Sequence, residues 1–157
     1  MTRPIAPLRD PLLISKAEAD DLAEVSELLL RAVPDCIPQT VDQLWERLDQ
    51  IWVAREVPGG PILASATLVE LDAQRQELRS VIVEPGARGS GVGQELIARL
   101  LASEESGDGD VCCVTRHPGF FQRLGFVPIG VPWESGATST RTRKRIPMRR
   151  RNREVSK

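Results

Sequence analysis

The segment from Arg79 to Leu101, RSVIVEPGARGSGVGQELIARLL, constrains the fold of this 157-residue chain more than any other. An apolar stretch at 81–83 ends before Pro85, passes through a loop with four glycines, and continues as an apolar, helix-forming run. A strand that turns through glycines into a helix is typical of α/β folds. Because the first helical N–H groups have no partner within the helix, they and the helix dipole form an anion site suited to phosphate.

Two common phosphate-binding patterns do not fit this loop. From Arg88 onward the glycines follow the spacing R-G-x-G-x-G, which differs from the dinucleotide fingerprint G-x-G-x-x-G. No Gly-Lys-Ser/Thr is present, which excludes the Walker loop. Glycines here let a phosphate approach the backbone without a Cβ in the way, and Arg88 adds a cation at the mouth. The loop therefore predicts a pyrophosphate site without a catalytic magnesium ion.

Hydrophobic periodicity elsewhere predicts alternating strands and helices with no internal repeat. Apolar residues recur at three- and four-residue spacing between Ala17 and Ala32, and Thr40 is placed to cap a following helix. We expect strands at 12–16, 51–56, 62–71, 77–84 and 111–115, and helices at 17–32, from 41 to about 48, 91–103 and from 117 to about 125. This order predicts a mixed sheet with helices on both faces.

Length and composition predict one domain spanning residues 1–157. No apolar run is long enough to span a membrane, and the proline-interrupted N-terminus lacks the apolar region of a signal peptide, so we expect a cytoplasmic protein. Three cysteines, two of them adjacent, and a single histidine give neither a disulfide framework nor metal-ligand spacing. We therefore expect no metal cofactor.

Charge is distributed unevenly along the chain. Residues 1–140 hold 12 basic and 21 acidic side chains, a net charge of −9, whereas residues 141–157 hold nine basic and one acidic, a net charge of +8. This basic segment predicts a last strand near 146–149 at the sheet edge, followed by a tail. Two alternatives stay open, because the tail could anchor an anionic substrate or bind nucleic-acid phosphates. The segment has no aromatic residues for base stacking, which disfavours nucleic acid.

Two motifs resemble those of the Gcn5-related N-acetyltransferase (GNAT) family. Arg88, Gly91 and Gly93 match the signature R/Q-x-x-G-x-G/A, and FFQRLGF at 120–126 matches the ending F-Y-x-x-x-G-F. The order of elements also agrees, over about residues 12–131. The resemblance implies the GNAT fold, with a central mixed, largely antiparallel sheet of six to seven strands flanked by about four helices. It also implies that the fourth and fifth strands splay apart. The alternative for the loop is a plain glycine-rich helix start.

Resemblance to this family implies acetyl-CoA as the cosubstrate. In that case the loop amides hold its pyrophosphate, the strand at 81–83 pairs with the pantetheine arm, and the thioester lies between the splayed strands. The implied cofactor-binding residues are Val81, Ile82, Val83, Arg88, Gly89, Ser90, Gly91, Val92, Gly93 and Phe121.

Within the family the chain is most similar to the acetyltransferase domains of N-acetylglutamate synthases. The segment QELRSVIVEP places Glu77 on the glutamate of their strand A-E-x-x-x-V-A-V-x-P, and TRHPGFFQRLGF is close to their T-x-x-x-x-x-F-F/W-x-x-x-G-F. An arsenic-resistance group of acetyltransferases shares the strand LRS-hydrophobic-x-V. Both groups therefore stay candidates for the nearest relatives.

The resemblance predicts a small-molecule amine as the acceptor, an amino acid or another carboxylate-bearing amine. The synthases bind their substrate with arginines before the second helix, where this chain has CIPQT, and with a C-terminal R-x-S. Here Arg153 and Ser156 stand one residue further apart than in that motif. The candidates for binding the acceptor are Arg79, Arg153 and Ser156, and glutamate itself is not implied.

Acetyl transfer requires the amine to lose a proton and the CoA thiolate to leave. Glu77 is the candidate general base, acting directly or through a water; the alternative is an ordinary surface glutamate at a strand end. Many relatives carry a tyrosine at the position of Phe121, but this chain contains no tyrosine. Thr115 and water are the remaining candidates for the acid, and Thr115 could instead only cap the strand end. We expect direct attack in a ternary complex.

Several other functions stay open. Cys112 and Cys113 alternate across a buried strand, which places at least one in the core, so an acyl-cysteine intermediate is a minor alternative. The missing tyrosine leaves a non-catalytic acetyl-CoA sensor as another alternative. The basic tail leaves a protein or RNA acceptor, and the sequence also leaves a homodimer open.

Overall fold

A computed structural model of the chain describes residues 11–33, 36–103, 107, 109–129 and 146–151. Seven strands form one sheet with the order β1-β2-β3-β4-β5-β7-β6. The strands are β1 (Leu13–Lys16), β2 (Ile51–Arg55), β3 (Ala64–Asp72), β4 (Arg75–Val83), β5 (Asp110–Thr115), β6 (Val127–Pro128) and β7 (Ile146–Arg151). Every neighbouring pair is antiparallel except β4 and β5, which run parallel. The predicted mixed, largely antiparallel sheet is confirmed.

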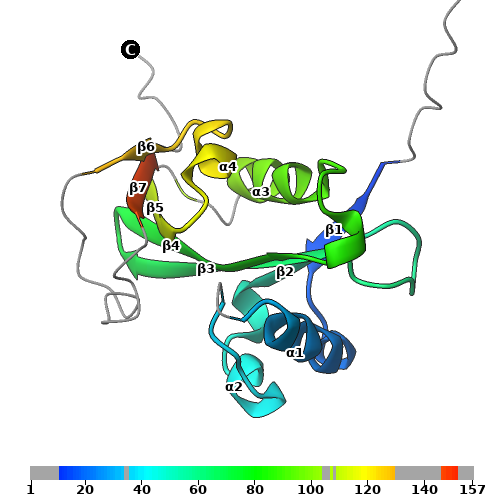
Figure 1. Cartoon of the computed structure of the whole chain (residues 1–157). Helices are drawn as coiled ribbons and strands as arrows, with labels where there is room; N and C mark the ends of the chain where they lie inside the picture. The colour runs from blue at the N-terminus through cyan, green and yellow to red at the C-terminus, as the bar shows by residue number, and fades with distance from the viewer. Residues whose placement is uncertain (1–10, 34–35, 104–106, 108, 130–145, 152–157) are drawn as a thin grey trace, which may run out of the picture.

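Helices cover both faces of the sheet (Figure 1). The helices α1 (Leu22–Arg31) and α2 (Val41–Trp45) lie on one face, and α3 (Val92–Ala102) and α4 (Pro118–Gln122) lie on the other. Each face has its own hydrophobic core. Leu22, Val25, Leu28 and Leu29 of α1 are buried in the first, and Leu96, Ile97 and Leu100 of α3 are buried in the second.

Three helices differ from their predicted bounds, and one of them, α4, ends at Gln122 rather than near residue 125. The predicted helix at 17–32 begins as a 3₁₀ turn at Ala19–Asp21 and becomes α-helical only at Leu22. The predicted helix after Thr40 does begin there, because Thr40 and Gln43 form a capping box, but α2 ends at Trp45. A second 3₁₀ turn, η2 (Leu48–Gln50), then leads directly into β2.

Strands β4 and β5 separate soon after they meet. They pair only at Arg75↔Asp110, Gln76↔Val111 and Glu77↔Cys112, although β4 continues to Val83 and β5 to Thr115. On its other side β4 contains a bulge, because Ala66 of β3 lies opposite both Ser80 and Val81. Ser80 adopts a left-handed conformation with φ +54°, the only non-glycine among the described residues with a positive φ. The splay implied by the family resemblance is therefore present.

The predicted last strand forms as β7, but it lies inside the sheet rather than at its edge. It pairs with β5 along its whole length and with β6 at Val127↔Arg149 and Pro128↔Met148. Met148 is fully buried and anchors this strand in the core. The two-residue strand β6, which the sequence did not predict, forms the sheet edge. Among the described helices, none is long and apolar enough to cross a membrane.

Candidate functional site

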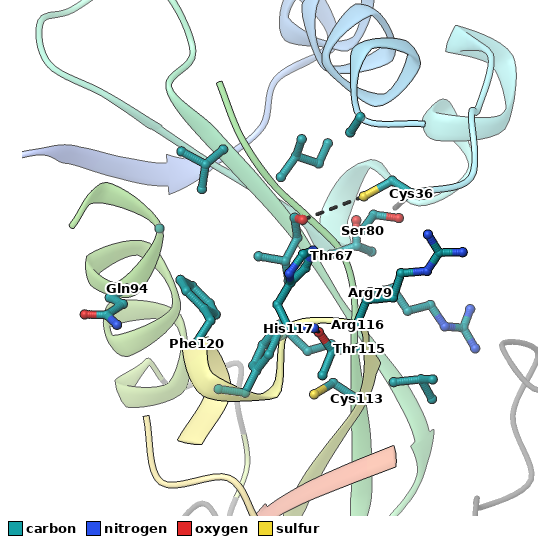
Figure 2. A pocket seen from close by; sticks show the side chains of 18 of the residues that line it. Cys36, Thr67, Arg79, Ser80, Gln94, Cys113, Thr115, Arg116, His117 and Phe120 are labelled. Carbon is teal, nitrogen blue, oxygen red and sulfur yellow. Dashed lines mark hydrogen bonds between the residues drawn. The ribbon is translucent and has the colours of Figure 1, made fainter. Parts of the chain in front are cut away.

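A cavity of about 870 Å³ opens where β4 and β5 diverge. It is lined by β4, by the glycine loop and the start of α3, by the end of β5, and by the start of α4. The connection between α1 and α2 contributes a further wall, including Cys36, Ile37 and Gln39. Figure 2 shows Gln94 and Phe120 at one end of the cavity, and Arg79 and Arg116 extending to the opposite side. The two ends of the cavity thus differ in chemistry.

Backbone amides line the end nearest α3. Gly89 and Gly91 have φ values of +80° and +88°, and a Cβ at either position would meet no atom within 4 Å. The first i→i−4 hydrogen bond of α3 runs from the amide of Glu95 to the carbonyl of Gly91. The amides of Gly93 and Gln94 come before it and have no partner within the helix. This loop is open and leaves backbone amides available to an anion, and the predicted pyrophosphate site stays a prediction.

Gly93 is required for packing rather than for ligand approach. A Cβ at this position would lie 2.8 Å from Val83 Cγ2 and 3.3 Å from the ring of Phe120. Such distances force one of these neighbours to move. The third glycine of the motif therefore lets the start of α3 lie against β4 and α4.

Nearly all of the predicted cofactor-binding residues line this cavity. They are Val81, Ile82, Val83, Arg88, Gly89, Gly91, Val92, Gly93 and Phe121. Ser90 is not among the lining residues, and its hydroxyl donates to the carbonyl of Ala87 and accepts from the amide of Val92 at 3.4 Å. Ser90 thus stabilises the loop from outside the cavity.

Glu77 and Arg79 form a buried ion pair on the cavity wall. Arg79 Nε donates to Glu77 Oε1 at 2.6 Å, and the side chains of Glu77 and Arg79 are 1% and 24% exposed. The interpretation of Glu77 as a surface glutamate is therefore wrong. A carboxylate taken out of water this completely needs a cationic partner, and Arg79, two residues along the same strand face, provides it.

Thr115 and Phe121 lie where β5 passes into α4. Thr115 is 7% exposed and lines the cavity, and its Oγ1 accepts from the amide of His117 at 2.8 Å. The hydroxyl therefore caps the strand end, which leaves its own proton to donate elsewhere. Phe121 packs edge-to-face against Phe120 and Phe126, with ring centroids 4.9 and 5.4 Å apart. It supplies apolar surface at the position where many relatives have a tyrosine.

The cysteines are buried thiols with little nucleophilic character. Burial raises the pKa of Cys112 to about 11, and the neighbouring Asp110 carboxylate adds to this effect. Burial also raises the pKa of Cys113, which lines the cavity. Both thiols are protonated at neutral pH, and the thiolate is the reactive form. An acyl-cysteine intermediate is correspondingly disfavoured.

Sequence reasoning missed several residues that reach the cavity from other elements. Gln39 Nε2 donates to Ser80 Oγ at 3.3 Å, and Cys36 Sγ donates to the carbonyl of Val81 at 3.7 Å. These contacts tie the connection between α1 and α2 to the β4 bulge (Figure 2). The other missed residues are Arg47, Thr67 and Arg116. No local motif marks Arg47 or Thr67, because only the topology brings them to the cavity. Cys36, Gln39 and Arg116 lie within the segments CIPQT and TRHPGFFQRLGF, whose patterns did not single them out.

Two predicted acceptor-binding residues, Arg153 and Ser156, lie outside the described residues. The third, Arg79, lines the cavity. Within the described ranges, no group of three or more His, Cys, Asp or Glu side chains is placed to hold a metal ion.

Comparisons with known proteins agree with this geometry. Residues 47–128 match the family model of the acetyltransferase (GNAT) domain. The fold is similar to that of Rv2747 from Mycobacterium tuberculosis, solved with CoA and a second ligand, with 21% identity, a TM-score of 0.76, and coverage of 88% of this chain and 98% of that one. No curated protein sequence gave a match.

Two further solved structures are similar to this chain. N-acetylglutamate synthase from Neisseria gonorrhoeae, solved with coenzyme A and N-acetyl-glutamate, has 18% identity and a TM-score of 0.75, over 92% of this chain but 36% of that one. The ribosomal-protein-S18-alanine N-acetyltransferase from Escherichia coli has 18% identity and a TM-score of 0.72, over 94% of this chain and 97% of that one. Because the family model spans more than half of the sequence, the chain belongs to the GNAT family of N-acetyltransferases.

Proposed function

We propose that this enzyme transfers the acetyl group of acetyl-CoA to the primary amine of a small molecule that carries a carboxylate. One observation supports this most directly. A single cavity connects the open amides of the glycine loop to the buried pair of Glu77 and Arg79. An anionic cosubstrate at one end and an anionic acceptor at the other would place their reactive groups between the splayed strands.

The cofactor end suits acetyl-CoA. The loop amides and Arg88 would hold the pyrophosphate, and the gap beside residues 81–83 leaves room for the pantetheine arm to pair with β4. The structures of Rv2747 and of the Neisseria synthase, both solved with CoA, support the same cosubstrate here. No metal takes part in this proposal.

The chemistry is a direct displacement at the thioester. The amine nitrogen forms a bond to the acetyl carbonyl carbon, the C–S bond breaks, and CoA leaves as a thiolate. Glu77 takes the amine proton through a water, because its carboxylate is buried and already accepts from Arg79. Thr115, whose hydroxyl proton is free of its capping bond, donates to the departing sulfur, and solvent completes its protonation.

The acceptor end suits a carboxylate. Arg79 and Arg116 extend to the same side of the cavity, and Glu77 is the only carboxylate among the lining residues of the described chain. Arg153 and Ser156 stay predicted contributors to this end. A cytoplasmic location and a homodimer likewise stay predictions.

Steady-state release of CoA with matched amines tests the proposal. Each amino acid is assayed beside the amine that lacks its carboxylate, and the product is identified by mass spectrometry. We expect acetylation of the amino acids with a kcat/KM at least tenfold above that of the decarboxylated amines, since a charged hydrogen bond contributes about 1.5–3 kcal/mol. Acetylation of peptides alone would favour a protein acceptor, and CoA binding without any turnover would favour a sensor.

A further inference from the structure

Thr67 of β3 is a buried polar side chain that the proposed reaction does not yet use. It is 6% exposed and lines the cavity near its centre (Figure 2). Within the described part of the chain, its hydroxyl has no hydrogen-bond partner. A hydroxyl removed from water without a partner is destabilising, so such a group facing a cavity points to a ligand that completes its hydrogen bonding.

Strand register places Thr67 beside Arg79. Thr67 lies directly opposite Arg79 on β4 and directly opposite Ile51 on β2. Directly opposed residues project from the same face of a sheet, and Ile51 belongs to the core beneath α1. Thr67 and Arg79 are therefore neighbours on the α1 face, at the start of the β4 bulge.

Arg79 has donors left over after its ion pair. Its Nε is bound to Glu77, and the terminal guanidinium nitrogens have no partner among the residues that the structure describes. A guanidinium fixed at Nε presents its remaining N–H groups in a known plane, which suits an incoming carboxylate. Glu77 thus orients the group that faces the acceptor.

Arg47 adds a second cation from another wall. It follows α2, lines the cavity, and its Nη1 donates to Gln50 Oε1 at 3.3 Å. Arg47 directly precedes η2, which leads into β2 at Ile51, the residue directly opposite Thr67. Glu77 offsets the charge of Arg79, whereas Arg47 has no carboxylate partner in the described structure. The charge that Arg47 contributes is available to an anionic ligand.

We propose that Thr67, Arg79 and Arg47 together bind the acceptor's carboxylate, with the Thr67 hydroxyl donating to one carboxylate oxygen. Thr67 is then a specificity-determining residue that selects amines carrying a carboxylate. This inference rests on the proposed function and assigns its acceptor selectivity to three side chains on different elements. The cofactor's phosphates are excluded as the partner of Thr67, because the glycine loop lies at the α3 end of the cavity, while Arg79 extends to the opposite side (Figure 2).

Thr67→Val tests this site because valine keeps the shape and removes the hydroxyl. We expect the KM for the carboxylate-bearing amine to rise roughly 10- to 100-fold, the effect of losing a hydrogen bond to a charged group. The KM for the matched amine without the carboxylate and the KM for acetyl-CoA should both stay unchanged. Thr67→Ser should retain the wild-type KM, and Arg47→Gln should repeat the selective loss.

Ser65→Ala is the matched control. Ser65 lies two residues earlier on the same face of β3, is 2% exposed, and is not among the residues that line the cavity. Its loss should leave all three KM values unchanged, while thermal unfolding and CoA binding establish that each variant is folded. Equal losses for both amines in Thr67→Val would overturn the inference by placing the hydroxyl at the amine or thioester.

The experiment distinguishes failure of the proposed function from failure of the role proposed for Thr67. If the wild-type enzyme does not prefer carboxylate-bearing amines, the proposed acceptor class is wrong and this inference falls with it. If the wild-type enzyme has the preference and Thr67→Val keeps it, only the role of Thr67 is wrong.

Discussion

At the scale of single residues, the pairing of Glu77 with Arg79 links the proposed base to the proposed acceptor site. The carboxylate is 1% exposed, and it accepts a hydrogen bond from Arg79 Nε at 2.6 Å. The same contact fixes the guanidinium that we propose faces the acceptor. In the proposed reaction one buried carboxylate serves both proton transfer and substrate orientation, and kinetic constants can separate the two roles.

Glu77→Gln is expected to lower kcat by roughly 10²–10⁴-fold, the usual contribution of a positioned general base. Glutamine keeps the size and one acceptor oxygen for Arg79, so the KM for the acceptor should rise much less than kcat falls. Steady-state kinetics from pH 6 to 9 measure both. Wild-type kcat together with a raised acceptor KM would reduce Glu77 to a residue that positions Arg79.

Titration of Cys112 should make the free energy of unfolding depend on pH, separately from any pH dependence of catalysis. Burial raises its pKa from 9.0 to about 11 in the folded state. Above about pH 9 the unfolded thiol loses its proton while the folded thiol keeps it, so the folded state binds more protons. The free energy of unfolding should therefore fall as the pH rises from 9 to 11. Urea unfolding across this range measures the slope, which should become shallower in Cys112→Ala, with Cys113 carrying the remainder. The slope should persist unchanged in the exposed-site control Gln122→Ala.

Sequence reasoning at this scale succeeded where residues stand next to each other in a motif. Arg88, Gly91 and Gly93 were predicted from a local pattern and line one cavity. The burial of Glu77 was not predicted, because it depends on β5 and on the α1 face, which lie far away in sequence. Thr67 and Arg47 were missed for the same reason. Strand register brings Thr67 to the cavity, and the turn between α2 and η2 brings Arg47 there.

At the scale of elements, glycine has two different roles in the loop before α3 and the first turn of that helix. Gly89 and Gly91 adopt positive φ values facing open space, whereas Gly93 lies against Val83 and Phe120. A spacing pattern in the sequence shows all three glycines alike. Only the packing of α3 against β4 distinguishes the open positions, Gly89 and Gly91, from the packed one, Gly93.

Gly91→Asp and Gly91→Asn form a pair that tests the loop. Both side chains tolerate the left-handed conformation better than most, and they differ in charge but hardly in size. Aspartate should weaken CoA binding well beyond asparagine, because its carboxylate would repel the pyrophosphate. Calorimetry at low and high salt measures the difference in CoA affinity between the two variants, which should become smaller at high salt because of screening. Equal affinities for both variants would move the phosphates away from this loop.

The order of elements was predicted more accurately than their ends. Strong periodicity identified α1 and α3, but the entry to α1 is a three-residue 3₁₀ turn with no buried residue, so the apolar spacing carries no information on its form. Strand β6 spans two residues, too few to show any period. The bulge at Ser80 left no signal either, because the residue type does not reveal its left-handed backbone.

At the scale of the whole molecule, part of the basic C-terminal segment belongs to the central sheet. Strand β7 lies between β5 and β6, Met148 is fully buried, and Arg150 Nε donates to the carbonyl of Leu124 at 2.8 Å. The segment from Ile146 to Arg151 is therefore part of the sheet. Residues beyond it are the ones that can be removed to test a role in substrate binding.

Two truncations separate structure from substrate binding. Ending the chain after Arg151 removes Arg153 and Ser156 but keeps β7, so the melting temperature should hold. If the removed residues bind the acceptor, its KM should rise while that of acetyl-CoA stays constant. Ending the chain after residue 145 removes β7, and we expect loss of the folded state by circular dichroism. An unchanged acceptor KM in the variant that ends at Arg151 would remove Arg153 and Ser156 from the site.

The short seam between β4 and β5 also divides the chain into two consecutive pieces. Strands β1 to β4 with α1 and α3 come from residues 11–102, and β5, β6 and β7 with α4 come from residues 110–151. Each piece keeps its own hydrogen-bonded ladder, and only three residue pairs join the two ladders. If the two pieces were produced as separate fragments, a ligand that binds both of them across the gap between β4 and β5 would favour their reassembly. Its free energy of binding would add directly to the free energy of reassembly.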